Sequence, residues 1–364
     1  MALEFAKLFQ EARLDGYQLE AFQEPEEVTE VPEDIRNDFV KLDLTLESLQ
    51  ELTNTYFTPQ STPLTPAQKN LMVMRHNAIL GNAPQMRLTV EDFDDATLSM
   101  EEDFRQRFIF GMEQTFQFLG KVLLNAIDFV KDMMDSTEKA IKRVTALRGA
   151  VRDYNPSGRI ELRKRRLQGA FDDGYGMWMP PEAVMPQLAL ATKHVFGDYW
   201  SDLERWISSA KVDTPPDSMG LNTYFEALPR QIRFQLVADR YHYLNIGKAQ
   251  YSPKSTVIDA PSRSKLTAVL DGTHDTLQTL KRKQTGVVNT LKLLELEGAK
   301  LRKALGGGLR ILLDPDTRLE YQQSVAGIRV KSRLAINVVK TFAAYSLALC
   351  EYSNQYVALV LSSK

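Results

Sequence analysis

Few residues in this sequence are of the types that carry out catalysis or bind metals. The chain of 364 residues has one cysteine, Cys350, and four histidines. The histidines are His76, His194, His242 and His274. No two of them have a spacing such as i, i+4, which places two imidazoles on one helical face for a metal ion. Cys350 follows Ala348 and Leu349, which predicts a buried apolar side chain, and a lone cysteine excludes an intramolecular disulfide.

The loop motifs of nucleotide and calcium sites are also missing from the sequence. The run Gly306-Gly307-Gly308 lacks the Lys-Ser/Thr pair of a phosphate loop, so we interpret it as a flexible connector between helices. The acidic stretches at residues 91–95 and 314–318 lack the central glycine and the terminal glutamate of a calcium loop. Helix capping and surface acidity explain them better. We therefore predict a protein with no catalytic residue, metal or cofactor.

An enzyme remains the least favoured of three hypotheses for this chain. Its active site would have to be assembled from scattered residues, such as Glu113, His242 or Asp314, that belong to no recognised motif. The observation that would favour it is a deep pocket containing acids with shifted pKa values.

Charge is distributed unevenly, although the net charge is only −2. Residues 1–60 contain fourteen acidic and four basic residues, whereas residues 139–168 contain ten basic and two acidic residues. Within the basic stretch the candidate polyanion contacts are Arg159, Arg163, Lys164, Arg165 and Arg166. A solvated basic face is the alternative explanation, and the sequence pI of about 6.2 argues against a dedicated DNA-binding protein. We expect at most a weak contact with DNA.

The elements that would position these residues are helices. Apolar residues recur at steps of three and four over residues 101–148, 262–305 and 316–361, which predicts three long amphipathic helices. Ser99 is an N-cap candidate for the first helix and Asp316 for the third. The short connection after residue 305 predicts that the last two helices form an antiparallel hairpin. The predicted fold is all-α, an elongated multi-helix bundle with a C-terminal helical hairpin.

Shorter elements and linkers divide the chain into three predicted regions. Residues 1–97 form an acidic, helical segment with proline-rich linkers, residues 98–260 a central helical region, and residues 261–364 the hairpin. Further helices are predicted at residues 2–14, 39–57, 65–80, 159–170, 181–195 and 199–209. Residues 172–181 and 251–261 are predicted as loops, and residues 224–245 as an extended loop plus a helix.

The most apolar window of the chain runs over residues 342–361. It contains Glu351, Asn354 and Gln355 near its centre, and a membrane-spanning helix tolerates such residues poorly. We therefore predict a buried or half-buried helix in a soluble protein with no membrane partner. The first residues are amphipathic and do not resemble a secretory signal.

Residues 90–165 resemble the internal head (inner-body) proteins of giant tailed bacteriophages. The resemblance rests on Leu98-Ser99-Met100-Glu101, which precedes a long helix, and on three later segments. These are Ser136-Thr137-Glu138-Lys139, Leu147-Arg148-Gly149 and Gly158-Arg159-Ile160-Glu161-Leu162. The resemblance implies a structural protein that is packed with DNA inside the capsid. When it is not part of a virion, such a protein is expected in the host cytoplasm. Its implied partners are other virion proteins, DNA and a second copy of the chain.

The same family implies proteolytic processing after a small residue, any residue and then glutamate. Ser99, Met100 and Glu101 fit this pattern, and so does Ala2-Leu3-Glu4. Helix capping by Ser99, with Glu102 three residues later, is the preferred explanation of that serine. The main alternative to a virion protein is a helical scaffold or adaptor that binds a protein partner through its long hairpin.

Overall fold

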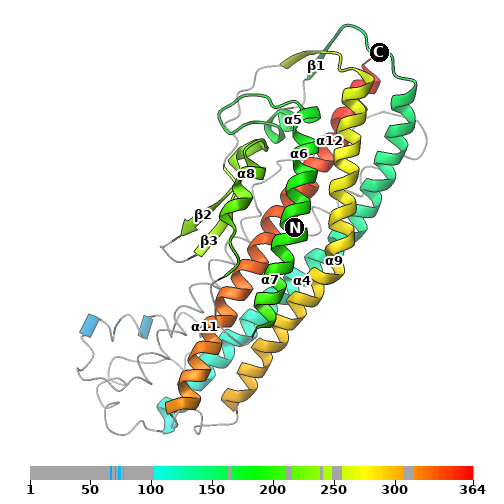
Figure 1. The fold of residues 1–364 in the computed structure, drawn as a ribbon. Coiled ribbons are helices and arrows are strands. Elements are labelled where there is room, and N and C mark those ends of the chain that lie inside the picture. The colour runs from blue at the N-terminus through cyan, green and yellow to red at the C-terminus, as the bar shows by residue number, and fades with distance from the viewer. Residues whose placement is uncertain are drawn as a thin grey trace.

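Three long helices dominate the molecule (Figure 1). The computed structural model describes residues 102–162, 165–209, 215–237, 241–247, 256–306 and 315–363, together with Pro66, Ala67, Asn70, Val73, Met74 and Asn77. The long helices are α4 (Glu102–Arg152), α9 (Arg263–Gly306) and a C-terminal helix built from α11 (Pro315–Asn337), η6 (Val338–Ala343) and α12 (Ala344–Ser362). The all-α fold expected from the sequence is confirmed.

The long helices alternate in direction. In Figure 1, α4 and α11–α12 run upward and α9 runs downward. Two ion pairs fix the antiparallel register of α4 and α9: Glu138 with Lys281 at 2.7 Å, and Arg148 with Asp271 at 2.5 Å. Moving ten residues forward along α4, from Glu138 to Arg148, therefore corresponds to moving ten residues back along α9, from Lys281 to Asp271. The C-terminal helices pack on α9 in the antiparallel sense expected of a hairpin, and α4 packs along α9 as well.

A fourth helical segment accompanies α9 in the same direction. The sequence predicted two helices, at residues 181–195 and 199–209, and that separation was wrong. The structure has one continuous helical path through α6 (Pro181–His194), the π-helix η3 (Val195–Tyr199) and α7 (Trp200–Ser208). Gly197 and Asp198 lie between the two predicted helices, but the wider π turn continues the helical path through them and keeps Val195, Phe196 and Tyr199 buried.

The end of α7 is tied to α11 by a buried lysine. Lys331 Nζ donates to the carbonyl oxygens of Ile207 at 2.8 Å and Ser209 at 2.7 Å, which satisfies groups that a helix end leaves unpaired. Burial lowers the pKa of Lys331, whereas the nearby Glu297 carboxylate acts in the opposite direction.

Two small antiparallel sheets correct the sequence prediction at three places. Residues 159–162 were expected to be helical, but they form β1 (Arg159–Leu162), which pairs with β4 (Thr256–Asp259). Only residues 165–170 of that stretch are helical, as α5 (Arg165–Ala170). The predicted loop at residues 251–261 therefore contains a strand. The partner of β1 lies nearly one hundred residues away in sequence, so no local pattern could reveal the pairing.

The third correction concerns residues 224–245. A hairpin of β2 (Arg233–Val237) and β3 (Tyr241–Asn245) replaces the predicted mixture of loop and helix. It follows the short helical turns η4 (Met219–Leu221), α8 (Asn222–Phe225) and η5 (Pro229–Gln231). The predicted loop at residues 172–181 is a loop in the structure, closed by a bridge between Asp172 and Trp178.

Two asparagines attach the β2–β3 hairpin to the helices. Phe234 and Leu244 are paired across the hairpin, and the backbone of each meets one asparagine side chain. Asn222 accepts from the Phe234 N–H at 2.7 Å and donates to its carbonyl at 3.1 Å. Asn337, at the end of α11, makes the same pair of bonds to Leu244, at 2.9 and 3.2 Å. Each amide thus mimics a neighbouring strand at one edge of the hairpin.

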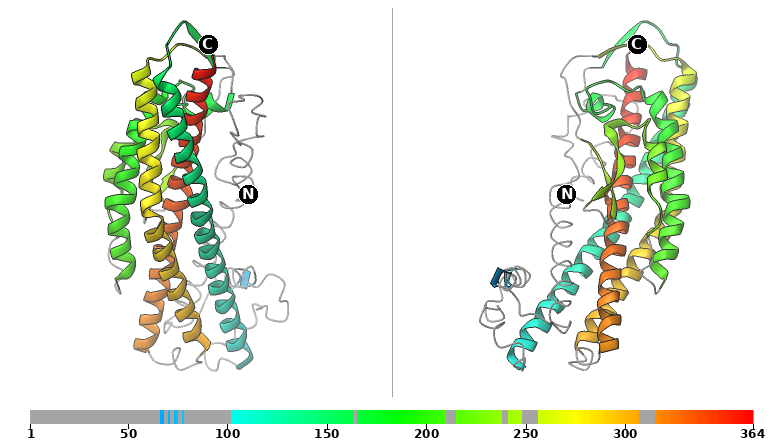
Figure 2. Two further views of the ribbon diagram at one scale, coloured as in Figure 1. Left: turned by 90° about the vertical axis from the view of Figure 1, so that its right-hand side faces the viewer. Right: turned by 60° about the vertical axis from the view of Figure 1, so that its left-hand side comes forward.

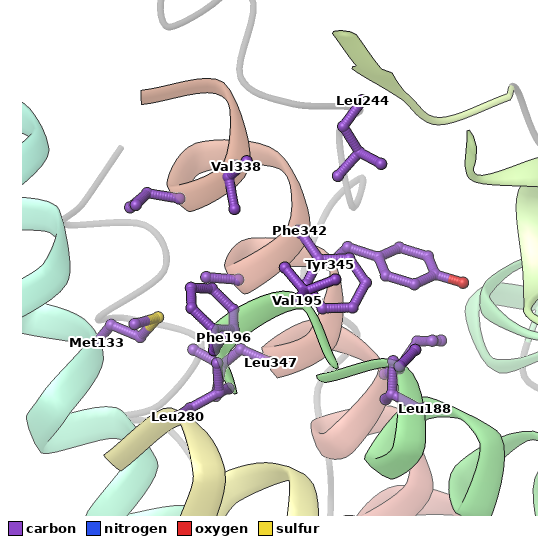
Figure 3. Close-up of a cluster of buried hydrophobic side chains, with 14 of the residues drawn as sticks. Met133, Leu188, Val195, Phe196, Leu244, Leu280, Val338, Phe342, Tyr345 and Leu347 are labelled. Atoms are coloured by element: carbon purple, nitrogen blue, oxygen red, sulfur yellow. The ribbon is translucent and has the colours of Figure 1, made fainter. Parts of the chain in front are cut away.

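The π-helical turns η3 and η6 meet in the core. Phe196 from η3 lies 6.1 Å from Phe342 of η6, measured between ring centroids. Figure 3 shows these rings with Tyr345 and Leu244 around them, so that two helices and the hairpin share one cluster. The buried Tyr345 hydroxyl donates to the Pro229 carbonyl at 2.8 Å. The apolar core is continuous from Phe116 to Val360, and the central region and the C-terminal helices both contribute to it.

The apolar C-terminal helix is largely buried. By length and composition, one window of Leu319–Ser362 is apolar enough to cross a membrane, and 78% of that window is buried inside the protein. Packing against α4, α6 and α9 therefore accounts for its hydropathy. Cys350 is fully buried on this helix, as predicted, and burial raises the pKa of its thiol. At the start of α11, Asp316 lies in the first turn because the helix begins at Pro315, so its predicted role as N-cap is wrong.

Candidate functional site

Basic residues from three elements gather at the end of the molecule drawn uppermost in Figure 1. Arg152 ends α4, Arg159 begins β1, and Arg263 begins α9. Two kinds of contact join these elements: β1 pairs with β4 through the backbone, and the Arg263 side chain donates from its guanidinium to the Tyr154 carbonyl at 3.1 Å. We call Arg152, Arg159, Arg263 and Lys265 the basic end.

The cations of the basic end have weak or partial partners. Arg159 Nε lies 3.4 Å from Asp259 Oδ1, and both side chains are about four-fifths exposed, at 79% and 88%. Lys265 lies 3.4 Å from Glu182 and is itself largely exposed. Exposed pairs of this kind contribute little to stability, so their charges stay available to an external ligand.

Acidic neighbours limit the strength of this surface. Asp153 and Glu161 are exposed beside Arg152 and Arg159. Asp259 is opposite Arg159 across the sheet. The four cations are thus matched by Asp153, Glu161, Asp259 and Glu182, so this surface suits at most a weak, salt-sensitive contact with a polyanion and not a deep, sequence-reading interface.

The predicted polyanion residues are only partly within the described chain. Arg159 is exposed on β1, and the backbone of Arg165 and Arg166 opens α5. Arg163 and Lys164 lie outside the described residues. The candidate processing motif Ser99, Met100 and Glu101 lies outside them as well.

Sequence reasoning missed Arg263 and Lys265 as members of this surface. They lie about one hundred residues beyond Arg159, and nothing in their local pattern connects them with it. The only available signal was their position at the start of a predicted long helix, and its packing partner was unknown. The antiparallel register of α4 and α9 brings them to the end of α4.

A second feature is an open groove between α4 and α9 in the opposite half of the molecule. Its volume is about 1040 Å³. The α4 side contributes Phe116, Gly120 and Leu124 to an apolar floor, and the rim is charged. The rim carboxylates are Glu113, Asp128 and Glu295, and the rim cations are Lys121, Arg302 and Lys303. A shallow, neutral groove of this kind fits a helix better than it fits a small substrate.

His194 and His274, the two histidines whose side chains the structure describes, do not come together. His194 stacks on Tyr224 at 4.0 Å between centroids and lies 3.0 Å from Asp198, whereas His274 contacts Gln278 and Asp275. His76 and the side chain of His242 are outside the described residues, as is Asp314. Within the described part of the chain, no group of three or more His, Cys, Asp and Glu residues is placed to hold a metal ion. Glu113 lines the groove, away from these histidines in sequence and on another helix.

The fold defines an elongated all-α bundle with two small two-stranded antiparallel sheets on its surface. Comparisons with protein-family models, with curated proteins and with solved structures find no match to this chain.

Proposed function

We propose that this chain is a non-enzymatic structural protein of a bacteriophage virion, located inside the head with the packaged DNA. The observation that carries the proposal is the basic end. A rod-like bundle whose tip presents exposed arginines among carboxylates can make weak contacts with DNA phosphates without base recognition, and it leaves its sides for neighbouring protein copies. The resemblance of residues 90–165 to internal head proteins supports the same role.

A helical scaffold or adaptor is the second candidate. The hairpin helices α9 and α11–α12 are packed against α4 and α6, so an adaptor would use another surface. One candidate is the loop that follows α5, where Tyr175 and Met177 are 75% and 68% exposed. Two aspartates stiffen this loop, because Asp172 accepts from the Gly174 N–H and Asp173 from the Tyr175 N–H, each at 2.7 Å.

Mass spectrometry of purified particles tests the virion assignment. We expect peptides of this chain in virions produced by the phage that encodes it, at many copies per particle. The expected peptides should resist mild protease treatment of intact virions, since the protein would be inside the head. Absence from particles, with abundance in the lysate, would contradict the proposal and favour the adaptor.

A salt titration of DNA binding tests the basic end. We expect Arg152→Glu combined with Arg159→Glu to weaken binding of the full chain to double-stranded DNA by about tenfold or more at low salt. The slope of log affinity against log salt should fall by about 2, since each lost phosphate contact removes about 0.9. A matched control, Lys292→Glu with Lys300→Glu on the exposed surface of α9, should leave both quantities near wild type. Equal effects of the two double variants would show that net charge, and not the basic end, governs binding.

A further inference from the structure

The sheet of β1 and β4 has an outer edge whose backbone groups follow from the pairing. The Ala260 N–H donates to the Gly158 carbonyl at 3.0 Å, and the register makes Ile160 the next β1 residue that bonds to β4. In an antiparallel ladder, residues bonded to the partner strand alternate with residues whose N–H and C=O point away from it. The backbone groups of Arg159 and Glu161 therefore point away from β4.

The two sheets differ in how their edges are covered. In the β2–β3 hairpin, the side chains of Asn222 and Asn337 bond the outward N–H and C=O groups of Phe234 and Leu244. The other sheet consists of β1 and β4 alone among the described residues, and Figure 1 labels β1 at the end of the molecule drawn uppermost. Figure 2 shows the chain that follows α4 arching over the helix ends there. A strand edge in such a position is a template for pairing with another strand.

The residue pattern of β1 is complementary to itself. A two-fold axis at Ile160 would place Arg159 of one copy opposite Glu161 of a second copy, and the reverse pair on the other side of the axis. Ile160 is 3% exposed and faces the core, whereas the side chains of Arg159 and Glu161 are exposed. Opposite charges directly across an antiparallel pair stabilise it, and like charges destabilise it. The exposed face of β1 therefore favours a second β1 strand as its neighbour.

We propose that two copies of this chain associate through β1, edge to edge and antiparallel about Ile160, so that their sheets join into a single sheet. Arg159 of each copy then exchanges both backbone hydrogen bonds with Glu161 of the other. This register uses every outward backbone group of the two residues. Moving the axis to Arg159 or to Glu161 would instead place like charges opposite each other, so the charges select the register centred on Ile160.

The surroundings of β1 permit this approach. Arg159 is 79% exposed, and its partner within the chain, Asp259, lies 3.4 Å away and is 88% exposed. Because exposed ion pairs of this kind contribute little to stability, Arg159 can change partner at little cost. The cations of the basic end are matched by nearby carboxylates, so two copies bring no large excess of like charge together.

Charge reversal, read by sedimentation of the full chain over a concentration series, tests this inference. We expect a dimer that dissociates on dilution, because a contact between two short strands is smaller than a standard interface. Arg159→Glu and Glu161→Arg should each raise the dimer dissociation constant at least about tenfold, since the axis places every substitution in the contact twice. The double variant Arg159→Glu/Glu161→Arg exchanges the two charges, and it should return the dissociation constant to within about threefold of the wild type.

Two proline variants test the backbone bonds. Glu161→Pro removes an outward N–H from β1 and should abolish the dimer, because proline cannot donate to a strand that pairs with this edge. Val257→Pro is the matched control: Val257 is opposite Glu161 in the sheet and 55% exposed, and its N–H points to the outer edge of β4. This control should leave the dimer intact.

Any of four results would overturn the inference. The first is a chain that stays monomeric up to about 1 mM, and the second is a dimer that both single charge reversals leave intact. The third is a loss of the dimer in the single variants that the double variant does not restore. The fourth is a Val257→Pro variant that weakens the dimer as much as Glu161→Pro does. The exchanged-charge variant keeps the net charge of the wild type, so its outcome is separate from the DNA titration and from the virion assignment.

Discussion

The two halves of the α4–α9 pair are held together differently. Near the basic end, α9 packs against α4 on one side and against α6 on another, and two ion pairs join it to α4. Toward the other end the core side is still closed, because a Cβ added at Gly298 would lie 3.3 Å from Leu119 Cδ2 and 3.4 Å from Ile328 Cδ1. The solvent side of the same two helices there forms the open groove.

The extent of α6 and α7 separates the two halves. Glu204 of α7 accepts from Thr290 at 3.0 Å, and α7 ends four residues later at Ser208. Beyond that point α9 has no neighbour of this kind among the described residues. In the half near the basic end, α4 and α9 therefore belong to a bundle of four packed segments. In the other half they belong to a bundle of three, because α6 and α7 do not extend that far.

The largest expected effect comes from Gly272→Ala in the closely packed half. A Cβ at this position would lie 2.5 Å from the Met185 carbonyl carbon and 2.6 Å from its oxygen. The obstacle is backbone of α6, so no side-chain rotation relieves it. We expect a loss of about 3 kcal/mol in the free energy of unfolding, measured by urea denaturation. A loss below about 1 kcal/mol would mean that α6 moves away from α9 at little cost.

A smaller effect of opposite sign is expected for Gly120→Ala in the groove. The position is helical and its Cβ would enter open space, so the substitution should stabilise by about 0.5–1 kcal/mol through helix propensity alone. Gly149→Ala is the matched control, because its Cβ also meets nothing within 4 Å and it lies near the other end of α4. A destabilising Gly120→Ala beside a stabilising Gly149→Ala would show that a tightly fitting occupant fills the groove.

The smallest effect is expected for Lys281→Ala in the ion pair with Glu138. Both side chains are about half exposed, so the change in stability at neutral pH should be near the limit of detection. The Lys281 ammonium, through its hydrogen bond, holds the pKa of Glu138 below its ordinary value. A lowered folded-state pKa contributes stability above the unfolded pKa, and this contribution is lost as pH falls through the folded pKa. NMR titration of Glu138 should show its pKa rising toward the ordinary value in the variant; an unchanged pKa would mean that the pair is not formed in solution.

The long helices could be predicted from the sequence because their signal is local and repeated. The pattern over residues 101–148 predicted a helix that the structure extends from Glu102 to Arg152, and the pattern over 262–305 matches α9 within a residue. Burial of Cys350 followed from its apolar neighbours. The strands were missed because β1 and β4 are stabilised by each other and the β2–β3 hairpin by Asn222 and Asn337, none of which is visible in a short window.

The sequence by itself determined the helical class, the approximate bounds of the long helices and the basic character of residues 159–166, since each depends on periodicity or composition within one segment. Tertiary structure alone decided which residues join Arg159 at the basic end, where α4 and α9 leave a groove, and that α6, η3 and α7 form one path. These features depend on register between distant segments, and register is set by contacts such as Glu138 with Lys281 and Gly272 with Met185. A single amphipathic pattern specifies which face of a helix is buried, but not the helix that covers it.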